Sequence, residues 1–384
     1  MNTRKRIWIL GIAGALSLLG GIWAQDTPSS QTVARPRKKA PADEPGTPAN
    51  ADGGSDLSKI PSKLSPKATK DHEEQADATF KSETNLVTVD AQVLDNHGNP
   101  IPGIPRGNFR ILEDNVPQTL SSFSTGEAPM TVAMVVEFSA RFQAFYSSGW
   151  AQTLNASYGF VGTLRPDDYV AVIAYDLKST ILSDFSNDRS KTMEALSRLR
   201  IPGFSESNMF DALTDTADRM SKIEGRKAIL LIASGIDTFS KLTYDKARKS
   251  LQESGVPVYS ISLLQAERII AEGAMGPIQN LDFLQADNEL KTFAKETGGQ
   301  AYFPRFVAEL PGVYQSLSQS LRNQYTLGFS SNNQAKDGKF RKLTIQLVNP
   351  ATNEPLRITD QKTGKPIKYT VLAKAGYKAP LPVE

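Results

Sequence analysis

The pattern of apolar and polar positions changes twice along the chain. From about residue 80 to residue 128, short apolar runs alternate with turn signals such as Asp95-Asn-His-Gly-Asn-Pro100. Runs joined by turns this short predict antiparallel strands. These strands are expected near Leu86–Val93, Phe109–Leu112 and Leu120–Phe123. After Asn323 the pattern returns, and strands are expected at Tyr325–Phe329, Leu343–Val348 and Ile367–Ala373, with an Asp337-Gly338 turn joining the first two.

Between residues 129 and 323, strands alternate with helices. The expected strands are Val132–Phe138, Tyr169–Tyr175, Thr180–Phe185, Ala228–Ala233, Val256–Leu263 and Ala301–Phe303. The expected helices lie at about 143–164, 188–200, 209–223, 244–254, 282–297 and 307–323. This alternation predicts an α/β fold with a doubly wound, mostly parallel sheet.

The two β segments, 80–128 and 324–378, flank the α/β segment 129–323. Because the ends of a domain often lie close together, we expect both segments to pack into one smaller β-sandwich unit beside the α/β domain. Residues 379–384 then form a tail.

The first 24 residues have the pattern of a signal peptide, with a basic start at Arg4-Lys-Arg6 and an apolar stretch from Ile7 to Trp23. Residues 25–79 are rich in Pro, Ser, Ala, Asp and Lys, which predicts a disordered linker. We therefore expect a secreted or periplasmic protein. The alternative is an inner-membrane anchor at residues 7–23, which is short against the roughly 20 residues of a spanning helix. The chain has no cysteine, which excludes disulfides and a lipid-modified cysteine.

Charge and composition exclude several classes of function. Without the three basic residues of the signal, the 44 Lys and Arg fall to 41 and balance the 41 acidic residues, so a nucleic-acid binder is not expected. His72 and His97 are the only histidines, and no phosphate-binding glycine loop precedes a helix. The pair Asp167-Asp168 follows Pro166 just before a strand, where a turn role is expected. The chain is therefore expected not to be an enzyme.

Several segments, in order, resemble the VWFA-related family of secreted bacterial proteins, in which a von Willebrand factor A domain lies between β segments. The resemblance covers roughly Thr84 to Lys378. The segments that carry it are Thr84–Asp90, Asn108-Phe-Arg-Ile-Leu-Glu-Asp-Asn-Val-Pro-Gln118, Gln324-Tyr-Thr-Leu-Gly-Phe329, Asp337-Gly-Lys-Phe-Arg-Lys342 and Ala373-Lys-Ala-Gly-Tyr377. The family is defined by its architecture, so the resemblance implies the fold and leaves the biochemical role open.

The resemblance also places the metal-ion-dependent adhesion site of A domains, whose pattern is Asp, Ser, Ser, Thr and Asp. The corresponding positions are Glu137, Ser139, Arg141, Ser207 and Ser234. The run Val132–Val136 does not alternate, as expected for a strand buried on both faces, and it delivers the first three positions to the carboxyl end of the sheet.

Two of these positions keep their chemistry, Ser139 and the hydroxyl of Ser207. Glu137 carries an extra methylene, Ser234 removes the second carboxylate, and Arg141 adds a positive charge where a cation would lie. Two like charges about 4 Å apart repel by roughly 4 kcal/mol at an effective dielectric of 20. A metal-free site is therefore expected, with Arg141 pairing to Glu137.

Two nearby acids leave an alternative open. Asp211 or Asp237 would rebuild a weak Mg²⁺ site, whereas the simpler interpretation is that Asp237 caps a turn and Asp211 caps or decorates a helix.

We therefore expect an interaction module that holds a protein partner at the rim formed by Glu137–Arg141, Ser205–Asn208 and Ser234–Phe239. The first alternative is an envelope scaffold that acts through the split β unit and carries an inert A domain. The second is a hydrolase that uses Ser139 or Ser234, for which the sequence offers no base.

Overall fold

The computed structural model describes most of the chain after residue 85, and all of these residues lie in one compact unit, Leu57–Glu384. The described residues are 86–126, 128–140, 150–199, 204–262, 264–265, 269, 276–360 and 364–382. The predicted signal peptide, the linker and Arg141 lie outside them.

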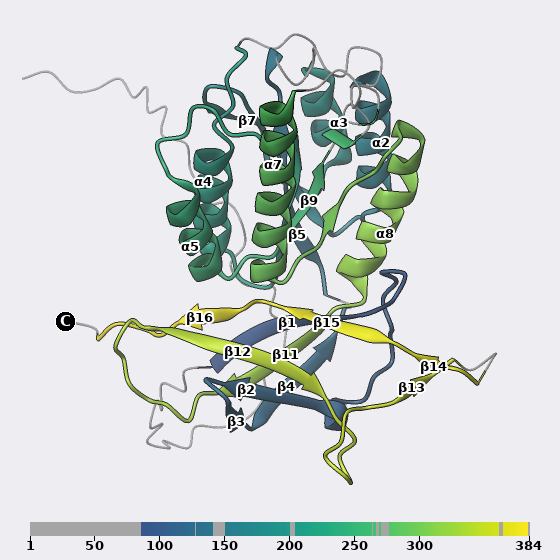
Figure 1. Ribbon diagram of the computed structural model, residues 1–384, viewed down its shortest axis with the longest axis vertical. Helices are drawn as coiled ribbons and strands as arrows, with labels where there is room; N and C mark the ends of the chain where they lie inside the picture. Colours follow the sequence, from purple (N-terminus) through teal and green to yellow (C-terminus); the bar gives the residue numbers. More distant parts are fainter. Residues whose placement is uncertain are drawn as a thin grey trace, which may run out of the picture. The chain divides into compact units, whose positions relative to one another are not determined.

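A six-stranded sheet forms the centre of the α/β domain (Figure 1), in the order β10-β9-β8-β5-β6-β7. Its strands are β5 Met130–Glu137, β6 Tyr169–Tyr175, β7 Ser179–Ser186, β8 Arg226–Ala233, β9 Val258–Ser262 and β10 Ala301–Tyr302. All neighbours are parallel except β7, which pairs antiparallel with β6 at one edge. The sheet therefore runs outward in both directions from β5, as in doubly wound folds.

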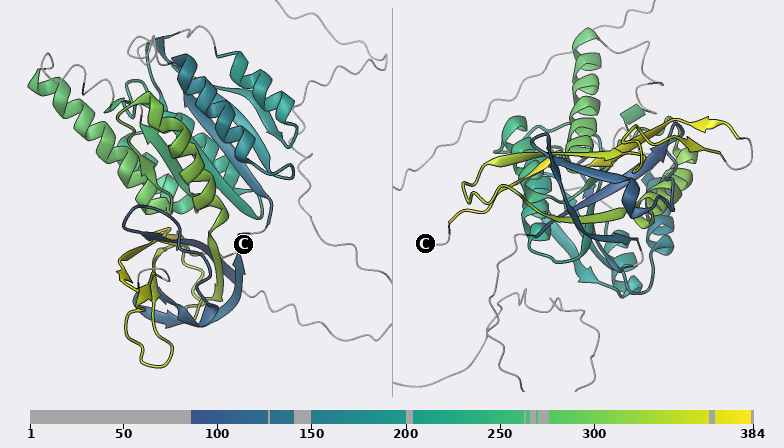
Figure 2. Two further views of the ribbon diagram at one scale, coloured as in Figure 1. Left: turned by 90° about the vertical axis from the view of Figure 1, so that its right-hand side faces the viewer. Right: turned by 90° about the horizontal axis from the view of Figure 1, so that it is seen from below.

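Helices cover both faces of this sheet (Figure 2). They are α2 Trp150–Thr163, α3 Arg189–Ser197, α4 Met209–Ser221, α5 Tyr244–Ser254, α7 Pro277–Thr297 and α8 Leu310–Arg322, preceded by a 3-10 turn at Val307–Glu309. Because successive strand residues point to opposite faces, Val132, Met134 and Val136 pack against α2, α3 and α8. Ala133 and Val135 pack against α4, α5 and α7. The predicted doubly wound α/β fold is confirmed.

Two four-stranded antiparallel sheets share a separate core (Figure 1), in the orders β15-β1-β11-β4 and β16-β12-β2-β3. Their strands are β1 Leu86–Asp95, β2 Phe109–Glu113, β3 Val116–Gln118, β4 Leu120–Thr125, β11 Tyr325–Ser330, β12 Phe340–Leu347, β15 Tyr369–Ala373 and β16 Gly376–Lys378. A 3-10 turn spans Arg106–Asn108, and β13 Ile358–Thr359 pairs with β14 Pro366–Ile367. Each sheet contains strands from both chain segments, so the predicted β-sandwich built from both sides is confirmed.

The α/β domain is inserted between two neighbouring strands of this β unit. Thr125, at the end of β4, is the register partner of Tyr325, at the start of β11. Gly126 lies so close to the end of α8 that an added Cβ would stand 1.7 Å from the Arg322 carbonyl oxygen. The two ends of the inserted domain therefore meet.

The predicted turn at Asp337-Gly338 does not join a hairpin, and this expectation was wrong. Strand β11 pairs with β1 and β4, whereas β12 pairs with β2 and β16, so the chain crosses from one sheet to the other. Gly338 does adopt a positive φ of 65°.

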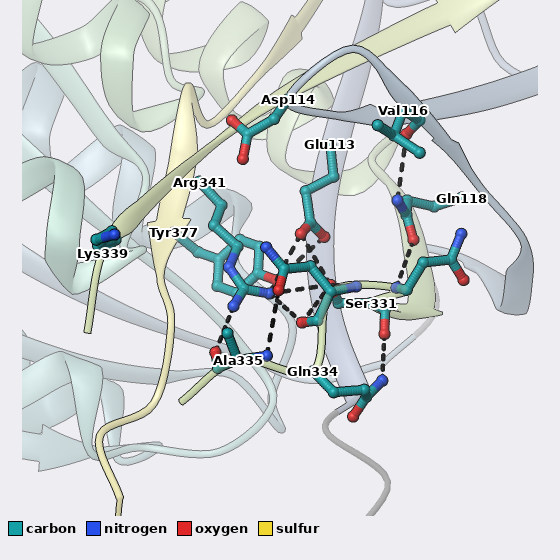
Figure 3. Close-up of polar contacts among 12 residues, drawn as sticks. Glu113, Asp114, Val116, Gln118, Ser331, Gln334, Ala335, Lys339, Arg341 and Tyr377 are labelled. Atoms are coloured by element: carbon teal, nitrogen blue, oxygen red, sulfur yellow. Dashed lines mark hydrogen bonds and ion pairs between the residues drawn. The ribbon is translucent and has the colours of Figure 1, made fainter. Parts of the chain in front are cut away.

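Arg341 fixes this crossing segment (Figure 3). Its guanidinium is buried, donates to the carbonyls of Asn333 and Ala335, and lies 3.3 Å from a Glu113 carboxylate oxygen. The Ser331 hydroxyl donates to the same Glu113 oxygen at 2.8 Å, and the Tyr377 hydroxyl donates to the other at 3.1 Å. Glu113, Arg341 and Tyr377 come from three of the segments that carry the family resemblance, so these segments meet in one buried polar cluster.

Candidate functional site

The predicted adhesion-site positions converge at the carboxyl end of the sheet, between β5 and β8. Glu137 is the last residue of β5, and Ser234 follows β8 directly. The chain leaves β5 toward β6 on one side and reaches β8 on the other, so this is the point where the strand order reverses. Open α/β sheets form their binding crevice at such a point.

Glu137 lies buried at this end of the sheet, where it forms the floor of the candidate site, and is 2% exposed. The Ser139 hydroxyl donates to one carboxylate oxygen at 2.9 Å, and the Ser234 backbone N–H donates to the other at 2.7 Å. Burial raises the pKa of Glu137, and the hydrogen bonds from Ser234 and Ser139 oppose that rise. Arg141, the partner expected for this carboxylate, lies outside the described residues.

The hydrolase alternative assumed that no base lies near Ser139, and that assumption was wrong. The Glu137 carboxylate is within hydrogen-bond distance of the Ser139 hydroxyl. Ser139 is nevertheless 0% exposed, so its hydroxyl is closed to a substrate in this structure.

Ser207 is hydrogen-bonded to the loop that contains Thr238 and Phe239. Its carbonyl accepts the N–H groups of Thr238 and Phe239 at 2.8 and 2.9 Å, and its own N–H donates to the Thr238 hydroxyl at 2.9 Å. The Ser207 hydroxyl and the Tyr175 hydroxyl are both buried. Burial, followed by the charges of Glu137 and Asp237, raises the pKa of Tyr175, and a hydrogen bond with the Ser207 side chain opposes that rise.

Asp237 bonds within its own turn, as the simpler interpretation expected, whereas Asp211 holds the backbone of Lys241 and Leu242 and does not cap a helix. Asp237 accepts the N–H of Phe210 in the first turn of α4 at 3.2 Å, and the Ser240 hydroxyl at 2.6 Å. Asp211 accepts the N–H groups of Lys241 and Leu242 at 2.9 and 3.0 Å. Burial raises the pKa of Asp237, and Asp211 adds to that rise.

The described side chains offer few carboxylate ligands to a divalent cation. Mg²⁺ requires near-octahedral oxygen ligation, yet no group of three or more His, Cys, Asp or Glu residues converges in the described part of the chain. Both oxygens of Glu137 already accept hydrogen bonds, and Asp237 is bonded to the start of α4. The absence of a metal stays a prediction.

Two aromatic side chains lie exposed on the loops around this floor. Phe204 is 47% exposed, and its carbonyl accepts the N–H of Ala140 at 2.7 Å. Phe239 is 56% exposed and is bonded through its N–H to Ser207. The sequence placed Phe239 on the rim but missed Phe204 and Tyr175. Tyr175 could have been found from strand register, because Glu137 and Tyr175 end neighbouring parallel strands as register partners.

The other candidate residues have structural roles or lie outside the site. Asp168 is buried, forms an ion pair with Arg322 and accepts the Met130 N–H at 2.9 Å, which makes it part of the fold. His97 is exposed in its turn. His72 lies outside the described residues. No helix in the described ranges has the length and apolar character needed to cross a membrane.

The chain was also compared with known proteins. No family model matches it. The UPF0353 proteins of Mycobacterium leprae strains Br4923 and TN are each 28% identical over 195 residues, covering 47% of this chain and 56% of theirs. The chain therefore spans about half the length of the curated relatives it matches.

Among solved structures, the von Willebrand domain of the type V pilus tip protein Mfa5 from Porphyromonas gingivalis has 13% identity and a TM-score of 0.40, with 50% of this chain and 95% of that chain covered. The conserved hypothetical protein BatB from Bacteroides thetaiotaomicron has 15% identity and a TM-score of 0.35, with coverages of 50% and 98%. These values are too low to add to what the strand order shows, which is a doubly wound α/β domain.

Proposed function

We propose that the protein is a non-enzymatic interaction module of the bacterial envelope or extracellular space. It binds a protein partner through the crevice at the carboxyl end of the sheet, without a metal ion. The observation that carries this proposal is the pair of exposed aromatic side chains, Phe204 and Phe239, beside a buried polar floor.

Exposed apolar side chains of the α/β domain gather on the segments that follow its strands. Fully burying a large apolar side chain stabilises by about 1.5–3 kcal/mol, so contiguous exposed ones mark interaction surfaces. The exposed large apolar residues on these segments are Phe204, Phe239, Ile269, Ile278, Leu281, Leu284 and Phe306. Aromatic residues are also enriched among those that dominate binding energy at protein interfaces.

The floor of the crevice supports binding rather than catalysis. Glu137 and Ser139 are buried and bonded to each other, and Asp237 is bonded to the start of α4. A general base must reach the proton that it removes. None of these three side chains is arranged to present a proton acceptor to a substrate, which favours a rigid binding surface.

The test is quantitative affinity capture with the full chain from envelope extracts of the source cells, in the presence of EDTA. Phe204→Ser and Phe239→Ser should each reduce the captured partner, whereas the matched control Phe340→Ser, an exposed phenylalanine of the β unit, should not. Equal capture by all of these variants would refute binding at the crevice. Loss of capture in EDTA alone would refute the metal-free site.

Deleting the inserted domain distinguishes the scaffold alternative from binding at the crevice. Because Thr125 and Tyr325 are register partners, a short turn can replace residues 126–324 and join β4 to β11 as a hairpin. A scaffold that acts through the β unit would keep its partner after this deletion, whereas a crevice binder would lose it.

A further inference from the structure

The strand register of the β unit determines how this unit responds to a pulling force. We propose that the β unit is a force-bearing joint between the chain before Leu86 and the inserted α/β domain, in which tension shears two central strands instead of peeling them apart. The source of the tension rests on the proposed function, because a partner bound at the crevice pulls on the inserted domain. The inner-membrane anchor at residues 7–23, the alternative that the sequence leaves open, would hold the other end.

Strands β1 and β11 are the two central strands of one sheet and run antiparallel. Their six register pairs extend from Leu86 and Ser330 at one end to Ala91 and Tyr325 at the other. Leu86 is the first residue of β1, and Tyr325 is the first residue of β11. The two strands therefore begin at opposite ends of this ladder (Figure 1).

The inserted domain is attached at the Tyr325 end of the ladder. Helix α8 ends at Arg322, and Thr125, the last residue of β4, is the register partner of Tyr325. A pull on the inserted domain therefore enters at this end through either connection, whereas a pull on the preceding chain enters at Leu86. The two pulls slide β1 and β11 past each other. Because the hydrogen bonds of an antiparallel pair lie across the strands, sliding strains all of them together, whereas a pull at one end breaks them in succession.

Side chains on both faces of the ladder oppose sliding. Val89 and Leu327 are register partners, and both are buried in the core of the β unit. On the other face, the Thr326 hydroxyl donates to the carboxylate of Asp90, its register partner, at 2.6 Å. A slip of one residue would turn every buried side chain of β1 to the wrong face of the sheet. The register is therefore strongly fixed.

Tyr325 fixes the end of the ladder at which the inserted domain pulls. Its hydroxyl donates to the Ile101 carbonyl at 2.7 Å and accepts the Ile104 N–H at 3.1 Å, both in the chain that follows β1. Its ring centre lies 4.8 Å from that of Phe109 and 6.1 Å from that of Phe123. Displacing the start of β11 therefore requires these contacts to break together with the ladder.

Force spectroscopy on single molecules tests the joint without a partner. The full chain has no cysteine, so one introduced cysteine is a unique handle, and the N-terminus carries the other. Ala128→Cys, at an exposed residue between β4 and β5, pulls on the ladder from the Tyr325 end. Asn332→Cys, at an exposed residue just after β11, is the matched control, because it pulls from the same end as Leu86. Both variants should melt like the wild type.

The first rupture in Ala128→Cys should need at least about twofold more force than in Asn332→Cys, because several pairs share the tension in the first geometry and one pair at a time carries it in the second. The rupture in Ala128→Cys should release residues 86–128, which adds up to roughly 150 Å at about 3.5 Å per residue. This length identifies the β unit as the part that yielded.

Tyr325→Phe in the Ala128→Cys chain should lower the rupture force further than Tyr369→Phe. The second change is the matched control, since it also removes one buried-side hydroxyl contact, the bond to the Leu356 carbonyl at 2.9 Å, but lies outside the ladder of β1 and β11. Equal rupture forces for the two cysteine positions, or equal effects of the two tyrosine changes, would overturn the joint. Either result would leave binding at the crevice standing, because no partner takes part in the measurement.

Discussion

Replacing Arg341 should reveal how strongly one buried cation holds the β unit together. Arg341 is 3% exposed, and its described partners are the carbonyls of Asn333 and Ala335, the Ser331 hydroxyl, the Glu113 carboxylate and, at 3.9 Å, the Asp337 carboxylate. In Arg341→Met the stem keeps its packing, but Glu113, itself 2% exposed, remains as a buried carboxylate without its cation.

Removing one partner of a buried ion pair costs about 3–5 kcal/mol, because the remaining charge stays buried. The hydroxyls of Ser331 and Tyr377 still donate to Glu113 in the variant, so the lower end of this range, about 3 kcal/mol, is expected. For a domain of 150–250 residues, each kcal/mol lowers the melting temperature by roughly 2–4 °C, which gives a fall of about 6–12 °C. Neutralising the partner as well, in Arg341→Met/Glu113→Gln, should restore part of the loss.

The assay combines thermal unfolding of the full chain with hydrogen exchange of the crossing segment 331–339. The single variant should melt earlier and exchange faster in this segment, while the amides of β5 and β8 keep their protection. A fall in melting temperature of less than about 2 °C, or a double variant as unstable as the sum of the two single ones, would refute the assignment of a coupled buried pair.

Three further predictions concern other parts of the molecule. Gly298→Ala, at a φ of 87° with an added Cβ only 2.5 Å from the backbone nitrogen of Lys374, should destabilise by about 2 kcal/mol or more. Gly225→Ala, at a similar φ in open space, should cost about 1 kcal/mol in the same melts. Calorimetric titration with Mg²⁺, Mn²⁺ and Ca²⁺ should give no binding heat, and micromolar binding abolished by Glu137→Ala would contradict the metal-free site. Burial raises the pKa of Asp168, but hydrogen bonds from Arg322 and two backbone N–H groups outweigh it and lower the pKa below 3.8. Asp168 therefore stabilises the fold above pH 3.8, and this stabilisation is lost as the pH falls through its lowered pKa. Urea unfolding of the wild type between neutral pH and pH 3 should show the loss. The same measurement on Arg322→Gln should show a smaller loss.

The regular elements of the α/β domain could be predicted because local signals agree with the tertiary environment. Helix α5 begins and ends where expected. Its end is set by Gly255, which adopts the left-handed conformation that stops a helix. Strand β5 was found from its unbroken apolar run. Helix α7 begins five residues earlier than expected, at Pro277, because a proline at the first helical position needs no hydrogen-bond partner for its nitrogen.

Two features could not be predicted, a tight turn that lacks the usual glycine and the exposure of one side chain. Strand β3 was missed because Asp114 and Asn115 both adopt positive φ and form a two-residue turn, whereas the sequence there was interpreted as the end of a strand. At the candidate site, the positions of Glu137, Ser207 and Ser234 followed from the resemblance. The exposure of Phe204 did not, since an isolated phenylalanine in a sequence is expected to be buried.

The insertion of the α/β domain into the β unit determines the order in which the chain can fold. Strands β1 to β4 are synthesised first, but most of their pairing partners follow Tyr325, so their hydrogen-bonding edges stay open until the inserted domain has been made. The entropy of closing so long a loop normally delays such pairing. Because the ends of the α/β domain meet, its folding brings Thr125 and Tyr325 together and closes the loop in advance. Folding of the inserted domain therefore precedes and assists pairing of the strands in the β unit. Mutations that destabilise the core of the inserted domain are expected to leave strands of the β unit unpaired and so to cause aggregation.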